Sequence, residues 1–218
     1  MKDSREDILG RIRRRLGRTA ENAAAGRADI DAVLARHAQG PRPAVEGDLV
    51  ARLRSRSEAL ASTVEIVERI EDAPAAVARY LSAHGLPLVA VAWPELAGLD
   101  WTGAGLRVEA RAARGDDLVG ITGVFCAVAE TGTLAVLSGA DTPASASLLP
   151  ETHVAIVPAA RIVPGMEEAF NLIRAECGGL PRAVNFISGP SRTGDIEQTL
   201  VLGAHGPYRV HIVIVREP

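Results

Sequence analysis

From residue 48 onward, apolar runs rich in Val, Ile, Leu and Ala alternate with stretches of helical periodicity. An apolar run of about four to eight residues predicts a buried strand, whereas apolar residues spaced by three and four predict an amphipathic helix. Alternation of the two kinds along one chain is typical of a mostly parallel sheet with helices on both faces. The chain is therefore expected to form an α/β, three-layer sandwich.

The boundaries of the expected elements follow from these runs. The segment 118–138 indicates a strand, a loop, a strand, a tight turn and a strand. Its hairpin around Glu130 adds an antiparallel pair, so the mostly parallel sheet is expected to be mixed. The other expected strands are 63–67, 87–92, 106–109, 152–157, 182–187 and 208–215, and the expected helices are 47–60, 73–84 and 165–177.

The N-terminal part of the chain is more densely charged than the rest. Residues 1–72 hold 14 of the 24 basic residues and 13 of the 27 acidic residues. A helix with a narrow apolar stripe is expected to begin at Ser4 and to end at Gly17. This stripe must cover another surface, either on the same molecule or on a second copy, so a homo-oligomer stays an open alternative.

A second short helix is expected near 28–38, followed by a Gly- and Pro-containing linker at 39–47. The sequence therefore predicts an N-terminal helical arm and linker at 1–47 and an α/β domain at 48–218.

Composition limits the functions that the chain can have. A formal net charge of −3 gives no reason to expect a nucleic acid as the partner. Two cysteines are too few for a disulfide framework, a four-cysteine zinc site or an iron–sulfur cluster. No histidine pair or carboxylate cluster has metal-ligand spacing, and no apolar run approaches the ~20 residues of a membrane span. A cytoplasmic protein without a metal or other cofactor of its own is expected.

Ligands of open α/β sheets bind beyond the carboxyl ends of the strands, and three polar loops are candidates for such a site. In the first, at 120–123, glycine backbone and the hydroxyl of Thr122 beside Gly123 suit an anion, with an ordinary turn as the alternative. In the second, Glu130 precedes Thr131, Gly132 and Thr133 between two apolar strands. This glutamate is a candidate nucleophile, general base or hydroxyl anchor, and the alternative is a turn acid that caps the backbone.

The third loop, at 188–199, follows a strand and is expected to enter a helix. Backbone N–H groups at a helix start, two hydroxyls and one guanidinium suit a phosphate or carboxylate. The alternative is that Asp195 and Glu197 only favour the helix N-terminus electrostatically. The loop has neither the P-loop pattern nor the dinucleotide fingerprint, so a nucleotide site of either type is unsupported. The candidate ligand-binding residues here are Gly189, Ser191, Arg192, Thr193, Asp195 and Glu197.

Two further candidates concern catalysis. His205 lies between small residues and is a candidate general base. Neither cysteine has a neighbouring nucleophile motif, and Cys126 in an apolar strand is expected to fill core volume.

Three long segments resemble the LUD domain of the lactate utilisation protein C family (LutC/YkgG). They are ITGVFCAVAETGTLAVLS at 121–138, LLPETHVAIVP at 148–158 and SGPSRTGDIEQTLVLGAHGPYRVHIVIV at 188–215. The opening run DILGRIRRRLGR is also similar to the start of that family. The resemblance implies a fold like that of the NagB/RpiA/CoA-transferase-like proteins. It also implies a three-protein system that oxidises L-lactate to pyruvate, with iron–sulfur clusters on the partner proteins only.

Three hypotheses follow. The first is a non-redox subunit or accessory protein of a lactate-oxidising system, in which Arg192 and neighbouring hydroxyls hold a small carboxylate and Glu130 or His205 handles a proton. The second is a free-standing enzyme, CoA-transferase-like or sugar-phosphate isomerase-like, that uses Glu130. The third is a module that senses lactate or a related metabolite.

Overall fold

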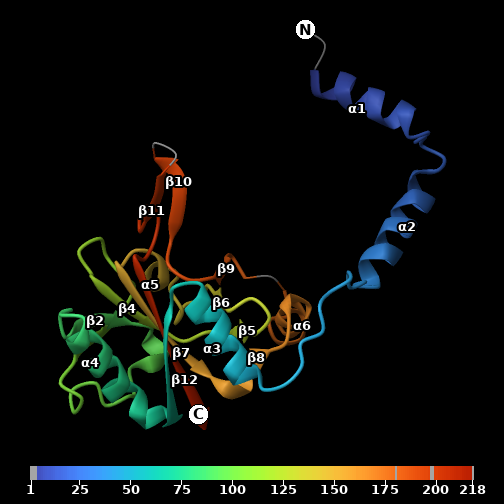
Figure 1. Ribbon diagram of the computed structural model, residues 1–218. Coiled ribbons are helices and arrows are strands. Elements are labelled where there is room, and N and C mark those ends of the chain that lie inside the picture. The colour runs from blue at the N-terminus through green and yellow to red at the C-terminus, as the bar shows by residue number, and fades with distance from the viewer. Residues whose placement is uncertain (1–3, 180, 197–198, 218) are drawn as a thin grey trace. The chain divides into compact units, whose positions relative to one another are not determined.

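The computed structural model describes residues 4–179, 181–196 and 199–217 (Figure 1). The chain divides into two units, Met1–Pro43 and Ala44–Pro218. Within the described part of the chain, no helix has the length and apolar character to span a membrane.

The first unit holds two helices, α1 (Ser4–Arg15) and α2 (Ala23–Ala35). Gly17 has a φ of 60°, and the N–H of Arg18 donates to the carbonyl of Arg13 at 2.8 Å, so the first helix ends where the sequence predicts. The second helix begins earlier than expected because its alanines extend it toward the N-terminus.

The second unit is built on a six-stranded sheet with the order β1-β12-β7-β4-β2-β3, and every neighbouring pair is parallel. This confirms the parallel α/β architecture. The strands are β1 (Thr63–Arg69), β2 (Val89–Ala92), β3 (Arg107–Ala110), β4 (Val119–Thr122), β7 (Thr152–Pro158) and β12 (Arg209–Glu217).

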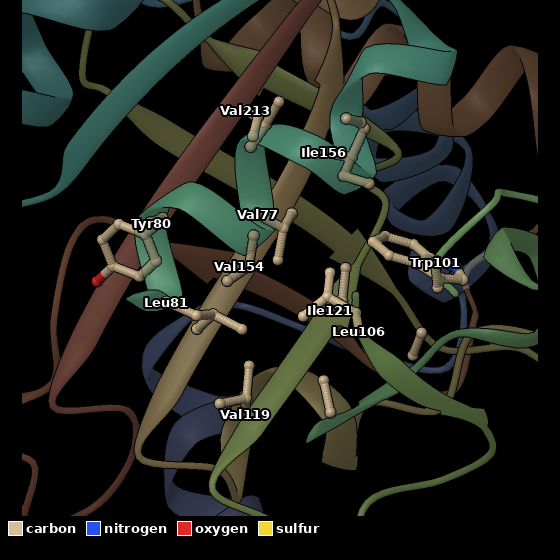
Figure 2. Close-up of a cluster of buried hydrophobic side chains, with 14 of the residues drawn as sticks. Val77, Tyr80, Leu81, Trp101, Leu106, Val119, Ile121, Val154, Ile156 and Val213 are labelled. Carbon is tan, nitrogen blue, oxygen red and sulfur yellow. The ribbon is translucent and has the colours of Figure 1, made fainter. Parts of the chain in front are cut away.

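One face of this sheet is covered by α4 (Ala73–Ala83), which follows the short η1 turn (Ile70–Asp72). Apolar residues of α4 recur at helical spacing, so Val77, Tyr80 and Leu81 all reach the sheet. They belong to one buried cluster with Val154 of β7 and Val213 of β12 (Figure 2).

The other face is covered by α3 (Leu49–Ala59) and by a second sheet. Asp48 caps α3 by accepting from the N–H of Val50, and Leu53 of α3 is fully buried against Ile212 and Ile214 of β12. The second sheet has four strands in the order β8-β5-β6-β9. They are β5 (Cys126–Val128), β6 (Thr133–Leu137), β8 (Ile162–Val163) and β9 (Val184–Ile187).

The expected antiparallel hairpin is formed by β5 and β6, and it lies in this second sheet rather than in the parallel one. Cys126 is fully buried, as expected for a residue that fills core volume. The remaining elements are η2 (Pro94–Leu96), α5 (Ser145–Leu148), η3 (Ala159–Arg161) and α6 (Met166–Glu176).

The prediction of a helix after residue 193 is wrong. The chain there forms a two-stranded antiparallel hairpin, β10 (Arg192–Ile196) and β11 (Thr199–Leu202), which extends away from the parallel sheet (Figure 1). Its β-branched residues favour strands, and pairing of the two segments outweighs the weak helix-start signal of the acidic residues.

Candidate functional site

The segment at 120–123 is not a loop, because Gly120, Ile121 and Thr122 belong to the buried strand β4. The hydroxyl of Thr122 lies 2.8 Å from Nε2 of His153, and both side chains are fully buried. Gly120 lies so close to α5 that a Cβ atom would stand 2.0 Å from the carbonyl oxygen of Ala146. Thr122 is therefore engaged inside the fold, and the prediction that this segment forms a loop is wrong.

The second and third predicted loops do come together. The hydroxyls of Thr131 and Thr133 lie 2.7 Å apart, and Thr133 Oγ1 lies 2.7 Å from Oγ of Ser188. Thr133 is buried, whereas Thr131 and Ser188 are exposed at the two ends of this chain of hydroxyls. We call these three residues the hydroxyl cluster. Their outer members keep hydrogen-bonding capacity for a ligand.

Two glycines let both loops approach the end of α3. Gly132 has a φ of 69°, and a Cβ atom there would stand 2.8 Å from the backbone of Arg56. Gly189 has a φ of 83°, and a Cβ atom there would stand 2.5 Å from the carbonyl oxygen of Leu60. Only glycine combines this backbone conformation with such close contacts at low cost.

Arg192 joins the same region from the start of β10. Its Nη2 donates a 2.8 Å hydrogen bond to the carbonyl of Leu60, the group that Gly189 also contacts. The side chain is exposed and makes no ion pair with any described residue. The remaining N–H groups of this guanidinium are therefore free to bind an anion from solvent.

The acid of the second loop lies at the turn between β5 and β6. Glu130 is half-buried, and its backbone N–H donates to the carbonyl of Pro164 at 3.0 Å. Among the described residues, the side chain of Glu130 accepts no hydrogen bond from the backbone of its turn. The N–H of Gly132 donates to the carbonyl of Val128 instead.

The other residues of the third loop are spread along the hairpin. Ser191 pairs through its backbone with Pro207 and Gly203, and the largely buried Thr193 lies in β10. Asp195 is also within β10, and Glu197 lies outside the described residues. His205 is exposed and lines a separate cavity at the base of the hairpin, which it does not share with Glu130.

Sequence reasoning missed a cavity of about 280 Å³ at the carboxyl ends of β2 and β4. From β2 the chain continues to β3, at one edge of the sheet. From β4 it continues to β7, which lies toward the opposite edge. Strand order therefore reverses between β2 and β4, and such a crevice is the usual ligand site of open α/β sheets. Its lining includes Trp93 and Glu95 after β2, Val124 and Phe125 after β4, and Leu137, Thr142 and Arg161.

Glu95 is the acidic group that lines this cavity, and its pKa is shifted. Partial burial of its carboxyl group raises the pKa of Glu95, and the neighbouring Asp141 adds to the rise. An ideal Cβ atom at Gly123 would stand 2.6 Å from Oε1 of Glu95, so the predicted site residue Gly123 makes room for this acid. The signal available in the sequence was an acid in the short segment that follows a buried strand.

The walls of this cavity are held by hydrogen bonds. Trp93 Nε1 donates to the carbonyl of Pro143 at 3.0 Å. Arg161 Nε donates to the carbonyl of Phe125 at 2.7 Å, and its two Nη atoms reach the carboxylate of Glu176 at 2.9 and 3.0 Å. The guanidinium also lies 4.7 Å over the ring of Phe125. These contacts fix both aromatic walls and use most of the donors of Arg161.

Comparison with known proteins adds a family. The model of the LUD domain family matches residues 50–215. The chain is 42% identical over 102 residues to "Lactate utilization protein C" of Bacillus subtilis (strain 168), a match that covers 45% of this chain and 42% of that protein. It is 37% identical over 129 residues to the protein of the same name from Bacillus licheniformis, with 54% of each covered. The matched segments thus span about half the length of these curated relatives.

One solved structure is similar in fold. The crystal structure of a DUF162 family protein from Deinococcus radiodurans aligns with a TM-score of 0.58 at 24% sequence identity, covering 79% of this chain and 99% of that one. This likeness supports the α/β architecture described above.

Proposed function

Because the chain belongs to the LUD domain family, we propose that it acts in lactate utilisation. The name shared by relatives at 37 to 42% identity is the observation that carries this proposal. In this role the protein is a cytoplasmic, non-redox component of a system that oxidises L-lactate to pyruvate, and the iron–sulfur clusters of that system belong to partner proteins.

The molecular task proposed for this component is to hold a small carboxylate at the hydroxyl cluster. The exposed guanidinium of Arg192 keeps free donors beside the carbonyl of Leu60. Gly189 lies close to the same carbonyl, and Ser188 precedes it in the chain. A carboxylate accepts hydrogen bonds from guanidinium and hydroxyl groups together, and charge-assisted bonds of this kind are strong. Glu130 at the neighbouring turn is the group proposed to handle a proton.

Calorimetry with L-lactate and pyruvate tests the binding task. Replacement of Arg192 with Gln removes the charge, and we expect affinity to fall by about tenfold or more. Arg107→Gln is the matched control, because Arg107 is an exposed arginine of β3, at the edge of the sheet opposite to β1. Equal affinity in a folded Arg192→Gln protein, or an equal loss in the control, contradicts the proposal.

The role in the system needs a separate experiment. The tagged chain is purified without oxygen from its native cells growing on lactate, and the eluate is assayed for iron and for lactate-dependent dye reduction. We expect iron-containing partners to co-purify, and we expect activity to fall when this chain is stripped away. A chain that elutes alone and iron-free contradicts a stable complex.

A further inference from the structure

A cavity of about 580 Å³ opens at the base of the β10–β11 hairpin. It lies at the amino ends of β7 and β12, the end of the parallel strands opposite to the Glu95 cavity. The loop 203–208 between β11 and β12 forms one wall, and the segment 148–151 before β7 forms another. A volume of this size is typical of sites for drug-sized molecules.

One side of the cavity suits an anionic group. Arg209 has no ion pair with any described residue, and its guanidinium lies 4.9 Å over the ring of Tyr208. In the loop beside it, the backbone N–H groups of Ala204, His205 and Gly206 have no hydrogen-bond acceptor within the described ranges. Free backbone N–H groups and a guanidinium that line one cavity can together donate to a phosphate.

A second side is apolar and open to solvent. Leu148 is 40% exposed, Leu149 is 57% exposed and Tyr208 is 46% exposed, and all three line this cavity. Large apolar side chains that gather in one concave surface indicate a ligand with an apolar or aromatic body.

The third side carries an acid. Glu151 lines the cavity without an ion pair among the described residues, and its carbonyl accepts the N–H of Arg209 at 3.0 Å, so the acidic and basic sides meet. A free carboxylate near a cation repels a bare anion, but it accepts hydrogen bonds from hydroxyl groups next to that anion.

We propose that this cavity binds a nucleoside phosphate. The phosphate lies on Arg209 and the loop N–H groups, the ribose hydroxyls donate to Glu151, and the base packs on Tyr208 and the two leucines. A simple phosphate leaves the apolar side unused, and a fatty acid leaves Glu151 without a donor. The site is separate from the hydroxyl cluster and does not depend on the role in lactate utilisation.

Calorimetry with AMP, ADP and ATP tests this proposal, with adenosine, inorganic phosphate and octanoate as partial ligands. We expect at least one nucleotide to bind more tightly than every partial ligand. Arg209→Gln should weaken nucleotide binding by about tenfold or more, and Glu151→Gln should weaken binding of nucleotide but not of phosphate. Arg216→Gln is the control, since Arg216 lies near the other end of β12.

His205→Pro, which removes one of the three free N–H groups at an exposed loop residue, provides a second variant if Arg209→Gln fails to fold. We expect His205→Pro to weaken phosphate-dependent binding and to leave adenosine unaffected. The proposal is overturned if no nucleotide binds at millimolar concentration, if inorganic phosphate or octanoate binds as tightly as the best nucleotide, or if Arg216→Gln loses as much affinity as the cavity variants.

Discussion

Thr122 Oγ1 and His153 Nε2 lie 2.8 Å apart on the adjacent parallel strands β4 and β7, and neither residue has exposed surface. A second pair of this kind joins Thr63 Oγ1 to His211 Nδ1 at 2.8 Å between β1 and β12. Burial lowers the pKa of His153 to about 4. Burial also lowers the pKa of His211 to about 4, with a smaller contribution from His84. Both histidines are therefore neutral in the folded protein at pH 7.

These two histidines predict a loss of stability in mild acid. Above pH 6.5, the ordinary pKa of a histidine, both side chains are also neutral in the unfolded chain. In that range neither histidine makes the unfolding free energy depend on pH. As the pH falls below this value, the unfolded chain takes up protons that the folded chain excludes until about pH 4. The unfolding free energy should fall by about 1.4 kcal/mol per pH unit for each histidine, or on the order of 3 kcal/mol each in total.

Urea unfolding between about pH 6 and pH 4.5 measures this slope. His153→Gln and His211→Gln should each reduce the slope of the unfolding free energy against pH by the contribution of one histidine. This holds whatever the substitution does to stability at pH 7. An unaltered slope in both buried variants contradicts the prediction.

Gly132 holds the second loop against α3, and replacement with Ala should disturb that contact. The left-handed backbone strains an alanine by about 1–2 kcal/mol. Its Cβ would also stand 2.8 Å from the backbone of Arg56 and Ser57, and such overpacking adds about 1–3 kcal/mol. Gly47→Ala is the matched control, because Gly47 has a φ of 84° with no atom within 4 Å of its Cβ position. Denaturant midpoints should be clearly lower for Gly132→Ala, and equal midpoints would refute the close contact.

Most elements of the second unit could be predicted because their apolar periodicity and their burial agree. The run at 152–157 is buried on both faces, as its unbroken apolar character indicates, and β12 is similar. The hairpin at 192–202 was missed because it has only two strands, and pairing between them is a tertiary property. The same holds for the assignment of β5 and β6 to a second sheet, since the sequence predicts the hairpin but not its partners.

The candidate site was predictable in composition but not in geometry. Glycines and hydroxyls at 131–133 and 188–189 signalled two loops, yet their contact through Thr133 and Ser188 joins positions 55 residues apart. Thr122 was misassigned because its partner, His153, lies on another strand. Glu95 escaped notice because its perturbed carboxyl depends on burial, on Asp141 and on the closeness of Gly123, which sequence spacing does not reveal.

The end of α3 offers a stabilising substitution. Ala61 has a φ of 66°, its N–H donates to the carbonyl of Glu58, and the next N–H, of Ser62, donates to Ser57. This is the left-handed helix end at which glycine is preferred. Ala61→Gly should raise the unfolding free energy by about 0.5–1 kcal/mol, since relief of strain exceeds the added chain entropy. The control Ala59→Gly, at the last residue of α3, should lower the unfolding free energy. A loss in both variants would contradict this account.

Glu95 should titrate above the usual range of a glutamate, because partial burial is the larger cause of its raised pKa and Asp141 is the smaller one. Carbonyl-detected NMR of the glutamate side chains, with Glu95→Gln to assign the signal, measures the midpoint directly. Asp141→Asn removes only the charge contribution, so the midpoint should fall but stay above that of exposed glutamates. Asp116→Asn, at another exposed aspartate, should leave it unchanged. An ordinary midpoint in the unmodified protein would contradict the effect of partial burial on this carboxyl group.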